Sequence, residues 1–473
     1  MRTQAPLSLT ILLLAGLYAM PAAAHAPTVV IEMNTDGFSP REVSVDANTI
    51  INFVNKDSVD RWPASNVHPT HDLYPEFDPK LPIKPGDLWI FKQPRPGVWK
   101  YHDHLFPHRR GTIIVEAEKA SAAPSEPRSS ANWRGWIKQL MLRLWQGFIG
   151  PFRPARAPVK MKTADFQNLN EQAQYRYVRQ ISQSAGPAAA WAYIKTTYTN
   201  NAGASLGGRA HDLAHFTGQL VFRQLGLTGL STCDATFAFG CYHGFTEAAF
   251  ATSLTPLPDV AQACTTIGPV NSGPWASCIH GIGHGIATYF DSANLEAALN
   301  TCDKLPDGAT YCHDGVLMEF SFSAAPSFYR RTDPLYPCSQ LPAPYLNACG
   351  RNQPHVMQRH LQMDRPAIAR ACLAGPPPIA EACIDALGFA FANESQGNPD
   401  VIVSQCRQLP TPDSQARCVA AGAGELIFQN YPNWQTAAPA ACYSLPAAYQ
   451  AACLARLEHT RRNYQKPSPT PGV

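Results

Sequence analysis

Apolar and polar positions alternate along the first part of the chain with the two-residue period of β-strands. The segments TVVIEM, EVSVDANTIINFVN, DLWIFKQ, GVWKYHDH and GTIIVEA show this pattern or run apolar, and the pairs Pro85-Gly86 and Pro96-Gly97 separate strands as turns. Short strands at this spacing are typical of a β-sandwich, here of about 90 residues. We therefore predict an all-β domain over residues 25–118.

Beyond residue 163 the apolar positions recur every three or four residues, which predicts helices. From Cys233 the sequence also repeats: CDKLPDGATYC, CSQLPAPYLNAC, CRQLPTPDSQARC and CYSLPAAYQAAC share a cysteine, a Leu-Pro pair and a second cysteine. The first cysteines of successive repeats, at positions 302, 338, 372, 406 and 442, are 36, 34, 34 and 36 residues apart. A period of about 35 residues indicates a solenoid of helix hairpins.

The cysteines follow this repeat, since all fourteen lie between Cys233 and Cys453. Pairing them in chain order would join the end of one repeat's second helix to the start of the next repeat's first helix. Each closed loop would contribute about 2–3 kcal/mol by constraining the unfolded chain. The predicted disulfides are Cys233–Cys241, Cys264–Cys278, Cys302–Cys312, Cys338–Cys349, Cys372–Cys383, Cys406–Cys418 and Cys442–Cys453.

The predicted chain is therefore multidomain, with an all-β sandwich followed by an all-α, disulfide-stapled helical-repeat solenoid. Its predicted parts are a signal peptide (1–24), the sandwich (25–118), a linker (119–162), the N-terminal helices of the α domain (163–232), the stapled repeats (233–464) and a disordered tail (465–473). Within the linker, residues 131–149 form a basic, tryptophan-rich amphipathic pattern. Such a helix suits a membrane surface or the apolar face of the chain's own α domain, and both interpretations stay open.

The N-terminus predicts export. Arg2, an apolar run from Leu7 to Ala19 and small residues ending at Ala24 are typical of a secretory signal peptide that is cleaved after Ala24. The cysteine content agrees with a periplasmic or secreted protein, because an oxidising compartment favours disulfides. A formal net charge of only +3 argues against nucleic-acid binding.

The β-domain also resembles a known family. FSPREVSVDANTIINFVNKD, RWPASNVHPTHDLYPEFD and IKPGDLWIFKQPRPGVWKYHDHLFPHRRGTIIVE together resemble the cupredoxins, the plastocyanin- and azurin-like copper proteins. Members bind copper through a histidine and, in the closing loop, a cysteine, a histidine and often a methionine. By position the first histidine falls at or near Arg61, the cysteine at Asp103, and the methionine at Arg109 or Arg110. The resemblance implies a cupredoxin fold without blue-copper chemistry, which requires the thiolate.

Histidines nevertheless gather at the same end of the domain, where five of the chain's fifteen lie between residues 68 and 108. Strand alternation places His102 and His104 on one face, with Asp103 on the other. Imidazole ligands favour Cu(II), Zn(II) and Ni(II), so we predict a non-blue copper site. The alternative is a set of surface or hydrogen-bonded histidines in a degenerate domain. The predicted ligands are His68, His71, His102, His104 and His108.

A second set of histidines marks the first repeats. Pairs four residues apart, such as His280 and His284, share one helical face, and equivalent positions of successive repeats stack in a solenoid. We predict a zinc or iron site here; the alternative is a buried polar ladder that only ties the repeats together. The predicted ligands are His211, His215, His243, Glu247, His280, His284 and Asp314, with Glu247 and Glu319 as candidate catalytic groups.

The repeats contain an internal control for this site. At the position of His243 and His280 the later repeats have Arg351, Asp385 and then alanine, so the fold itself does not require histidine there. Glycine inside a helix costs about 1 kcal/mol relative to alanine. The three glycines of HGIGHG therefore predict that a backbone or a ligand approaches this helix closely.

Three functions stay open. The first is an exported, non-enzymatic metal-binding protein, with copper in the β-domain and a periplasmic protein partner or second metal on the solenoid. The second is a metalloenzyme, an oxidoreductase or hydrolase with its site in the solenoid His/Glu cluster. The third is a stapled scaffold that binds proteins. In period and layout, but not in signature residues, the repeats resemble tetratricopeptide and Sel1-like solenoids.

Overall fold

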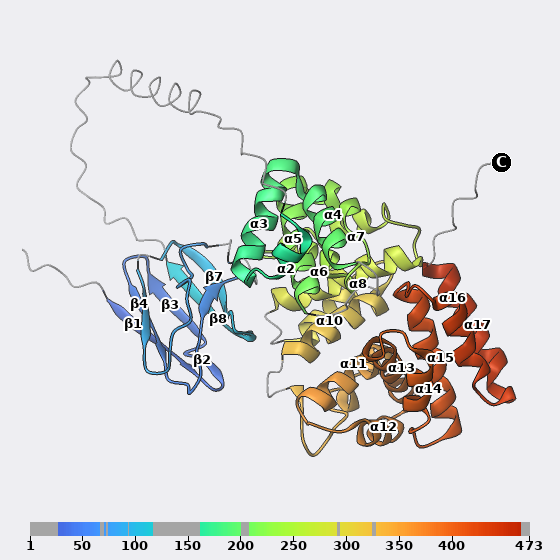
Figure 1. Cartoon of the computed structure of the whole chain (residues 1–473). Coiled ribbons are helices and arrows are strands. Elements are labelled where there is room, and N and C mark those ends of the chain that lie inside the picture. The colour runs from blue at the N-terminus through green and yellow to red at the C-terminus, as the bar shows by residue number, and fades with distance from the viewer. Residues whose placement is uncertain are drawn as a thin grey trace, which may run out of the picture.

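The computed structural model describes residues 27–66, 71, 74–92, 94–116, 161–199, 208–290, 294–323 and 328–464. Figure 1 shows a β-domain at the N-terminal end and a larger helical domain after it, which confirms the predicted fold class. The predicted signal peptide, residues 131–149 and the tail from residue 465 lie outside the described residues.

The β-domain consists of two four-stranded sheets, with strand orders β2-β1-β4-β6 and β3-β8-β7-β5. The strands are β1 (Thr28–Asn34), β2 (Gly37–Ser39), β3 (Glu42–Asp46), β4 (Ile50–Asn55), β5 (Pro63–Ser65), β6 (Leu88–Phe91), β7 (Gly97–Asp103) and β8 (Phe106–Glu116). The sequence pattern predicts the longer strands but not β2 and β5, because three residues are too few to show a period. In β5, Ala64 pairs with His102 of β7, which brings a second segment beside the histidines.

Aromatic side chains fill the space between the two sheets. Alternation along β4 and β7 sends Phe53 and Tyr101 inward, where their rings meet at a centroid distance of 5.4 Å. Phe77, from the loop between β5 and β6, packs against both. The end of β7 is therefore packed against this aromatic core through Tyr101, which fixes the position of the residues that follow.

The helical domain begins at Thr163. Its helices are α2 (Thr163–Gln167), α3 (Glu171–Ala185), α4 (Pro187–Tyr198), α5 (Arg209–Leu225), α6 (Gly240–Ala249), α7 (Leu257–Cys264), α8 (Gly273–Tyr289), α9 (Leu295–Cys302), α10 (Ala309–Ser323), α11 (Leu346–Arg359), α12 (Arg365–Leu373), α13 (Pro377–Glu394), α14 (Pro399–Cys406), α15 (Pro412–Phe428), α16 (Trp434–Tyr443) and α17 (Ala447–Tyr464). None of the helices in the described part of the chain combines the length and the apolar character needed to cross a bilayer.

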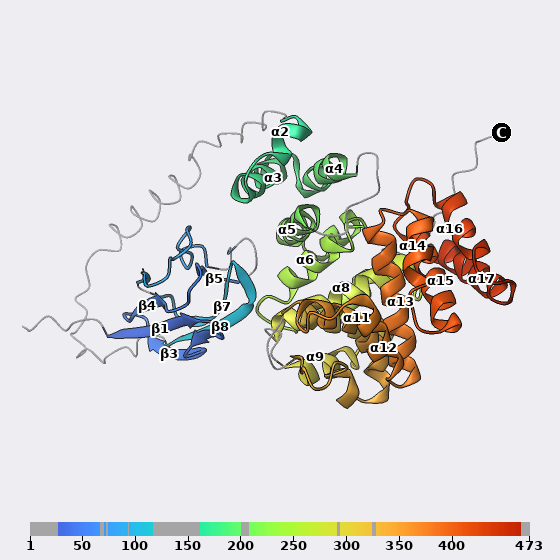
Figure 2. The same cartoon turned by 60° about the horizontal axis from the view of Figure 1, so that its bottom comes forward.

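These helices form two layers. One row contains α5, α6, α8, α10, α11, α13, α15 and α17, packed side by side in chain order, and the shorter α7, α9, α12, α14 and α16 form the other layer. The row curves back toward its start, because Phe239 before α6 contacts Phe428 at the end of α15 at a ring distance of 5.5 Å. Figures 1 and 2 show this curved arrangement from two sides.

Seven disulfides join the fourteen cysteines in chain order, in the pairs given above. Most of them connect the end of a short helix to the next long one. Cys264, the last residue of α7, for example, pairs with Cys278 in α8 with Cα atoms 5.7 Å apart. The first and fourth pairs start instead at 3₁₀ turns, at the residue after η1 (Gly226–Thr232) and within η3 (Cys338–Gln340). A 3₁₀ turn thus replaces the short helix in two repeats.

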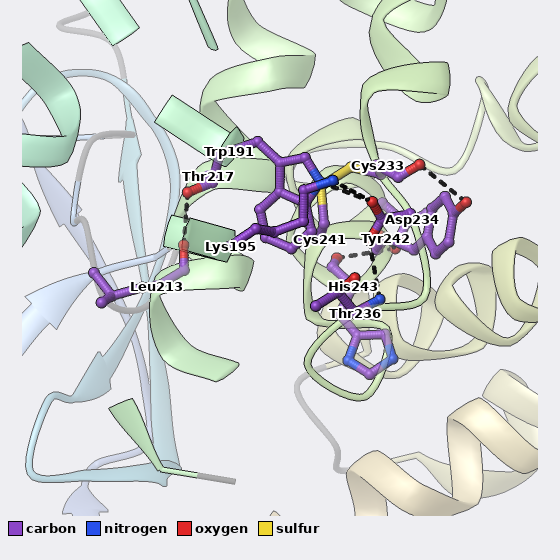
Figure 3. Close-up of a disulfide and its surroundings, with 11 residues drawn as sticks. Trp191, Lys195, Leu213, Thr217, Cys233, Asp234, Thr236, Cys241, Tyr242 and His243 are labelled. Atoms are coloured by element: carbon purple, nitrogen blue, oxygen red, sulfur yellow. Dashed lines mark hydrogen bonds and ion pairs between the residues drawn. A yellow bond between two sulfur atoms is a disulfide. The ribbon is translucent and has the colours of Figure 1, made fainter. Parts of the chain in front are cut away.

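The first disulfide positions helix α6 (Figure 3). Next to Cys233, the carboxylate of Asp234 accepts a hydrogen bond from Lys195 at 2.7 Å, and the Tyr242 hydroxyl donates to the carbonyl of Cys233 at 3.2 Å. These contacts hold the chain that enters α6. His243 lies two residues after Cys241, and this anchor therefore sets its position.

Glycines bring the first helices of the row into backbone contact. A Cβ atom at Gly244 in α6 would lie 1.8 Å from the carbonyl oxygen of His215 in α5. At Gly283 in α8 it would lie 2.1 Å from the carbonyl oxygen of Cys312 in α10. In the HGIGHG segment, the close neighbour of Gly283 is therefore the backbone of the next helix.

The β-domain contacts the helical domain through β7 and β8. Lys100 donates to the carbonyl of Tyr289, and Arg110 donates to the carbonyl of Thr288 at 3.2 Å, so both reach the end of α8. Arg110 also lies 3.5 Å from the carboxylate of Glu319 in α10. Figure 2 shows β7 and β8 on the side of the domain that faces the helices.

The glycine contacts predict a stability test. Gly283→Ala should lower the free energy of unfolding by about 1–3 kcal/mol, because α8 and α10 must move apart to fit the methyl group. Gly424→Ala in α15 is the matched control, because its Cβ would lie 3.4 Å from its nearest neighbour, the hydroxyl of Thr460. That variant should be unchanged or stabilised by up to about 1 kcal/mol through helix propensity. Urea unfolding followed by circular dichroism measures both; equal stabilities would contradict the close-contact explanation.

Candidate functional site

Three of the predicted β-domain ligands lie together. His71 comes from the loop after β5, His102 from the end of β7 and His104 from the turn that follows, and one ring nitrogen from each lies within 4.8 Å of the others. All three side chains are buried, and Nε2 of His71 is 3.0 Å from Nδ1 of His104. His68 lies outside the described residues, and only the backbone of His108 is described, in β8.

The Nδ1 atoms of two members of this triad, His71 and His102, have defined partners outside it. Nδ1 of His71 lies 2.7 Å from the carboxylate of Asp78, and Nδ1 of His102 lies 3.0 Å from the amide oxygen of Asn66. These oxygens only accept, so each Nδ1 carries the hydrogen and each Nε2 keeps a lone pair. Such partners orient imidazoles in metal sites. Sequence reasoning missed Asp78 and Asn66, because their closeness depends on the loop path between β5 and β6.

Burial also sets the charge of this triad. Burial and the neighbouring His71 lower the pKa of His104 to about 4. Burial alone would raise the pKa of Asp78, but His71 and Lys80 hold it well below its usual range. Asp78 is thus an anion at neutral pH, and His104 is neutral, which is the form of imidazole that binds a metal.

The predicted histidine ladder is also assembled in space. Nε2 of His211 and Nε2 of His215, both on α5, lie 3.0 Å apart, and Nδ1 of His243 on α6 is 3.2 Å from Nε2 of His215. On the other side, the ring of His243 stacks on that of His284 at a centroid distance of 3.8 Å, and His280 is 5.4 Å away. These five histidines therefore form one continuous cluster across α5, α6 and α8.

Each predicted carboxylate faces one of these imidazoles. Glu247 lies 3.1 Å from Nδ1 of His215, Asp314 lies 3.2 Å from Nδ1 of His280, and Glu319 lies 3.1 Å from Nδ1 of His284. All three carboxylates approach the outer nitrogen of the ring. This geometry suits groups that orient imidazoles better than it suits direct ligands or proton-transfer groups.

The electrostatics support this role for the carboxylates. Burial alone would raise the pKa of Glu319, but its hydrogen bond to His284 and the charge of Arg110 lower it to about 2. Burial would lower the pKa of His215, but Glu247 raises it above the ordinary value. Burial and the surrounding histidines hold the pKa of His243 well below its usual range. Glu319 is thus a permanent anion at neutral pH, and His243 carries no positive charge.

The ladder continues into the later repeats as ion pairs. Arg351 lies 3.5 Å from Asp314, and Asp385 pairs with Arg417 at 2.9 Å and with Arg456 at 2.8 Å. His280, Asp314 and Arg351, at equivalent positions of three successive repeats, therefore do stack, as the period predicts. At these positions the side chain changes from imidazole to carboxylate to guanidinium along the row.

A cavity of about 910 Å³ lies along the inner face of the row. His280 and Asp314 line one part of it, and His355, Glu425 and Phe428 line others. Burial raises the pKa of Glu425, although Gln429 and Asn393 hydrogen-bond to it. The histidine cluster thus meets this cavity at His280.

Comparison with known proteins identifies the β-domain. Residues 7–115 match the family model described as a cupredoxin-like domain. The N-terminal domain is cupredoxin-like. No curated protein matches the chain.

Two solved structures are similar to part of the chain. A novel purple cupredoxin from Nitrosopumilus maritimus matches at 22% identity and a TM-score of 0.16, over 18% of this chain and 98% of that one. A blue copper oxidase from Nitrosomonas europaea matches at 14% identity and a TM-score of 0.16, over 21% of this chain and 41% of that one. The chain thus spans less than half of that oxidase.

The copper positions of the cupredoxin-like domain hold an ion pair instead. Arg61 and Asp103, which fall at the first-histidine and cysteine positions of the family, are both buried, with Nη1 and Oδ2 3.2 Å apart. The Asp103 carboxylate also accepts the backbone N–H groups of Trp62 at 3.1 Å and Leu105 at 3.0 Å, and Arg61 also pairs with Asp57. Blue-copper ligation does not fit these side chains.

The methionine position is replaced as well. The guanidinium of Arg109 lies over the ring of Phe106 at 4.7 Å and 3.7 Å from Asp57, and it thereby joins the same ion-pair network. Arg110 points to the helical domain, as described above. The imidazoles of His71, His102 and His104 therefore form a separate site, and their donor set fits a copper ion held by nitrogen ligands.

The buried ion pair predicts a clear asymmetry between variants. Asp103→Ala should destabilise the β-domain by about 3–5 kcal/mol, because the guanidinium of Arg61 would stay buried without this partner. The double variant Arg61→Met/Asp103→Leu should lose much less, since apolar side chains often replace a buried pair at little cost. Differential scanning calorimetry of the full chain measures the unfolding transition of each variant. An Asp103→Ala protein as stable as the parent would contradict this account of the pair.

Proposed function

We propose that this protein is an exported copper-binding protein whose cupredoxin-like domain binds the ion through His71, His102 and His104. The observation that carries the proposal is the convergence of three buried imidazoles, two of which face hydrogen-bond acceptors at Nδ1, so that their Nε2 atoms carry the lone pairs. Burial in a rigid domain favours neutral imidazoles, which do not need to lose a proton before they bind.

The ligand set defines what the bound ion would do. Without a cysteine, the site would hold copper as a nitrogen-ligated, non-blue centre suited to binding and delivery rather than rapid electron transfer. Trp62 packs against His104 at a ring distance of 4.6 Å and donates to Asp78 at 2.8 Å. This side chain thus shields the triad from water and fixes the carboxylate that orients His71.

Copper titration tests this site. We expect the His102→Ala/His104→Ala double variant to bind one Cu(II) fewer per chain than the parent, as measured by elemental analysis and electron paramagnetic resonance. His459→Ala is the matched control, because that exposed ring contacts Asn463 and belongs to neither cluster. The parent should also lack the intense visible absorption of a Cu–thiolate bond. Equal copper content in parent and double variant would overturn the β-domain site.

Export is the second part of the proposal. Seven disulfides suit an extracellular or periplasmic protein, because such compartments keep cysteines oxidised. We expect the mature protein from a bacterial host to lack residues 1–24 and to begin at His25. N-terminal sequencing of the periplasmic fraction measures this. A chain that stays in the cytoplasm and starts at Met1 would contradict export.

A second candidate function is a metalloenzyme whose site is the helical His/Glu cluster. The cavity of about 910 Å³ beside His280 favours it, since pockets of this size hold small-molecule ligands. Zinc or iron at this cluster would supply a Lewis acid or an oxygen-activating centre. A protein partner on the solenoid and membrane contact through residues 131–149 stay predictions.

A further inference from the structure

The hydrogen-bond pattern of the helical histidines requires a cation on α5. Nδ1 of His211 lies 2.8 Å from the carbonyl oxygen of Phe237, and a carbonyl only accepts, so Nδ1 carries the hydrogen. Nδ1 of His215 faces the carboxylate of Glu247, so it carries a hydrogen as well. Both Nε2 atoms then present lone pairs to each other across 3.0 Å. Two acceptors at this distance need a proton or a metal ion between them.

A second triad leaves three acceptors unused. The Nδ1 atoms of His280 and His284 face Asp314 and Glu319, which leaves lone pairs on both Nε2 atoms. Nε2 of His243, Nε2 of His280 and Nε2 of His284 are all buried without a hydrogen-bond partner. Leaving a buried polar atom unpaired is unfavourable. One ring nitrogen from each of these histidines lies within 4.8 Å of the others, close enough for one metal ion to bind all three once the rings reorient.

His243 belongs to both triads. Its Nδ1 lies 3.2 Å from Nε2 of His215, and the first triad consists of His211, His215 and His243. Its Nε2 is one of the three unpartnered nitrogens of the second triad, beside those of His280 and His284. An imidazole has lone pairs on both nitrogens only when it is deprotonated. Metal ions on both sides would stabilise that form, and the proton that His243 loses would be released to solvent.

We propose that the helical domain binds two divalent metal ions, copper or zinc, bridged by the imidazolate of His243. His211 and His215 complete one site, and His280 and His284 complete the other. Glu247, Asp314 and Glu319 each face Nδ1 of one ring, those of His215, His280 and His284 in turn, and supply negative charge that buried divalent ions need.

The two sites differ in their surroundings. The stacked rings of His243 and His284 must tilt for both Nε2 atoms to point at one ion. His280 lines the large cavity, so the second ion is the one that a small molecule in the cavity would reach. The first ion would lie between α5 and α6, beside His211 and His215, whose side chains are half-buried, whereas all three rings of the second triad are buried.

Copper(II) alone is the probe for this bridge. The experiment uses the full chain with the His102→Ala/His104→Ala changes, which remove the β-domain triad and keep the two proposals independent. We expect two Cu(II) per chain and an electron paramagnetic resonance intensity well below the copper content, because an imidazolate couples the two spins. Full intensity from two bound ions would show two unbridged sites and overturn the bridge.

Single variants then locate each ion. His211→Ala and His280→Ala should each leave one Cu(II) with full, uncoupled intensity, whereas His243→Ala should abolish coupling and weaken both sites. His355→Ala is the matched control, since Nε2 of His355 is also buried without a partner and its side chain lines the same cavity. That variant should keep two coupled ions.

Other results would overturn the proposal. No copper bound to the background chain would mean that protons, not metals, hold the cluster together, and His243→Ala that loses only one ion would exclude a shared ligand. Circular dichroism of each variant confirms folding. If His243→Ala fails to fold, the His211→Ala and His280→Ala spectra decide the question, because the loss of either ion must restore full intensity to the other.

Discussion

Backbone contact between neighbouring helices is the constraint on which the helical site depends. Gly244 lets α6 touch α5 at the carbonyl of His215, and Gly283 lets α8 touch α10. Any side chain at these positions would hold the helices further apart. Imidazoles on adjacent helices would then be too distant to share an ion or a hydrogen, and the disulfides that anchor helix starts could not restore the approach. The close approach of the histidines therefore depends on the glycines.

The cupredoxin-like domain shows how a fold can keep its frame while its chemistry changes. Arg61 and Asp103 contact each other where the family resemblance places two copper ligands, so the frame still brings these positions together. In this protein a buried ion pair occupies the positions at which family members hold copper. The histidine triad takes two members, His102 and His104, from the residues on either side of Asp103 in the sequence and its third from the loop after β5. An ion pair at the family's ligand positions and a cluster of histidines beside it are thus compatible within one sandwich.

The β-domain contacts Glu319, one of the carboxylates that face the helical histidines. Arg110, at the family's methionine position, contacts Glu319, and Glu319 in turn contacts His284. Docking of the β-domain therefore adds a positive charge beside a carboxylate that the second triad uses. Charges from Glu171 and Arg209, at the starts of α3 and α5, also act on His104. Charged side chains of each domain thus act on the histidine cluster of the other.

The sequence by itself determined the order of the domains, the seven cysteine pairs and the helical face shared by residues such as His280 and His284. These features are local or periodic, so spacing alone reveals them. Only the tertiary structure decided that Asp78 and Asn66 orient the β-domain imidazoles, that Asp103 pairs with Arg61, and that Glu247 and Glu319 face Nδ1 atoms. Those contacts depend on loop paths and on how closely helices approach. Neither is encoded in a repeating pattern, because each arises from the packing of segments far apart in the chain.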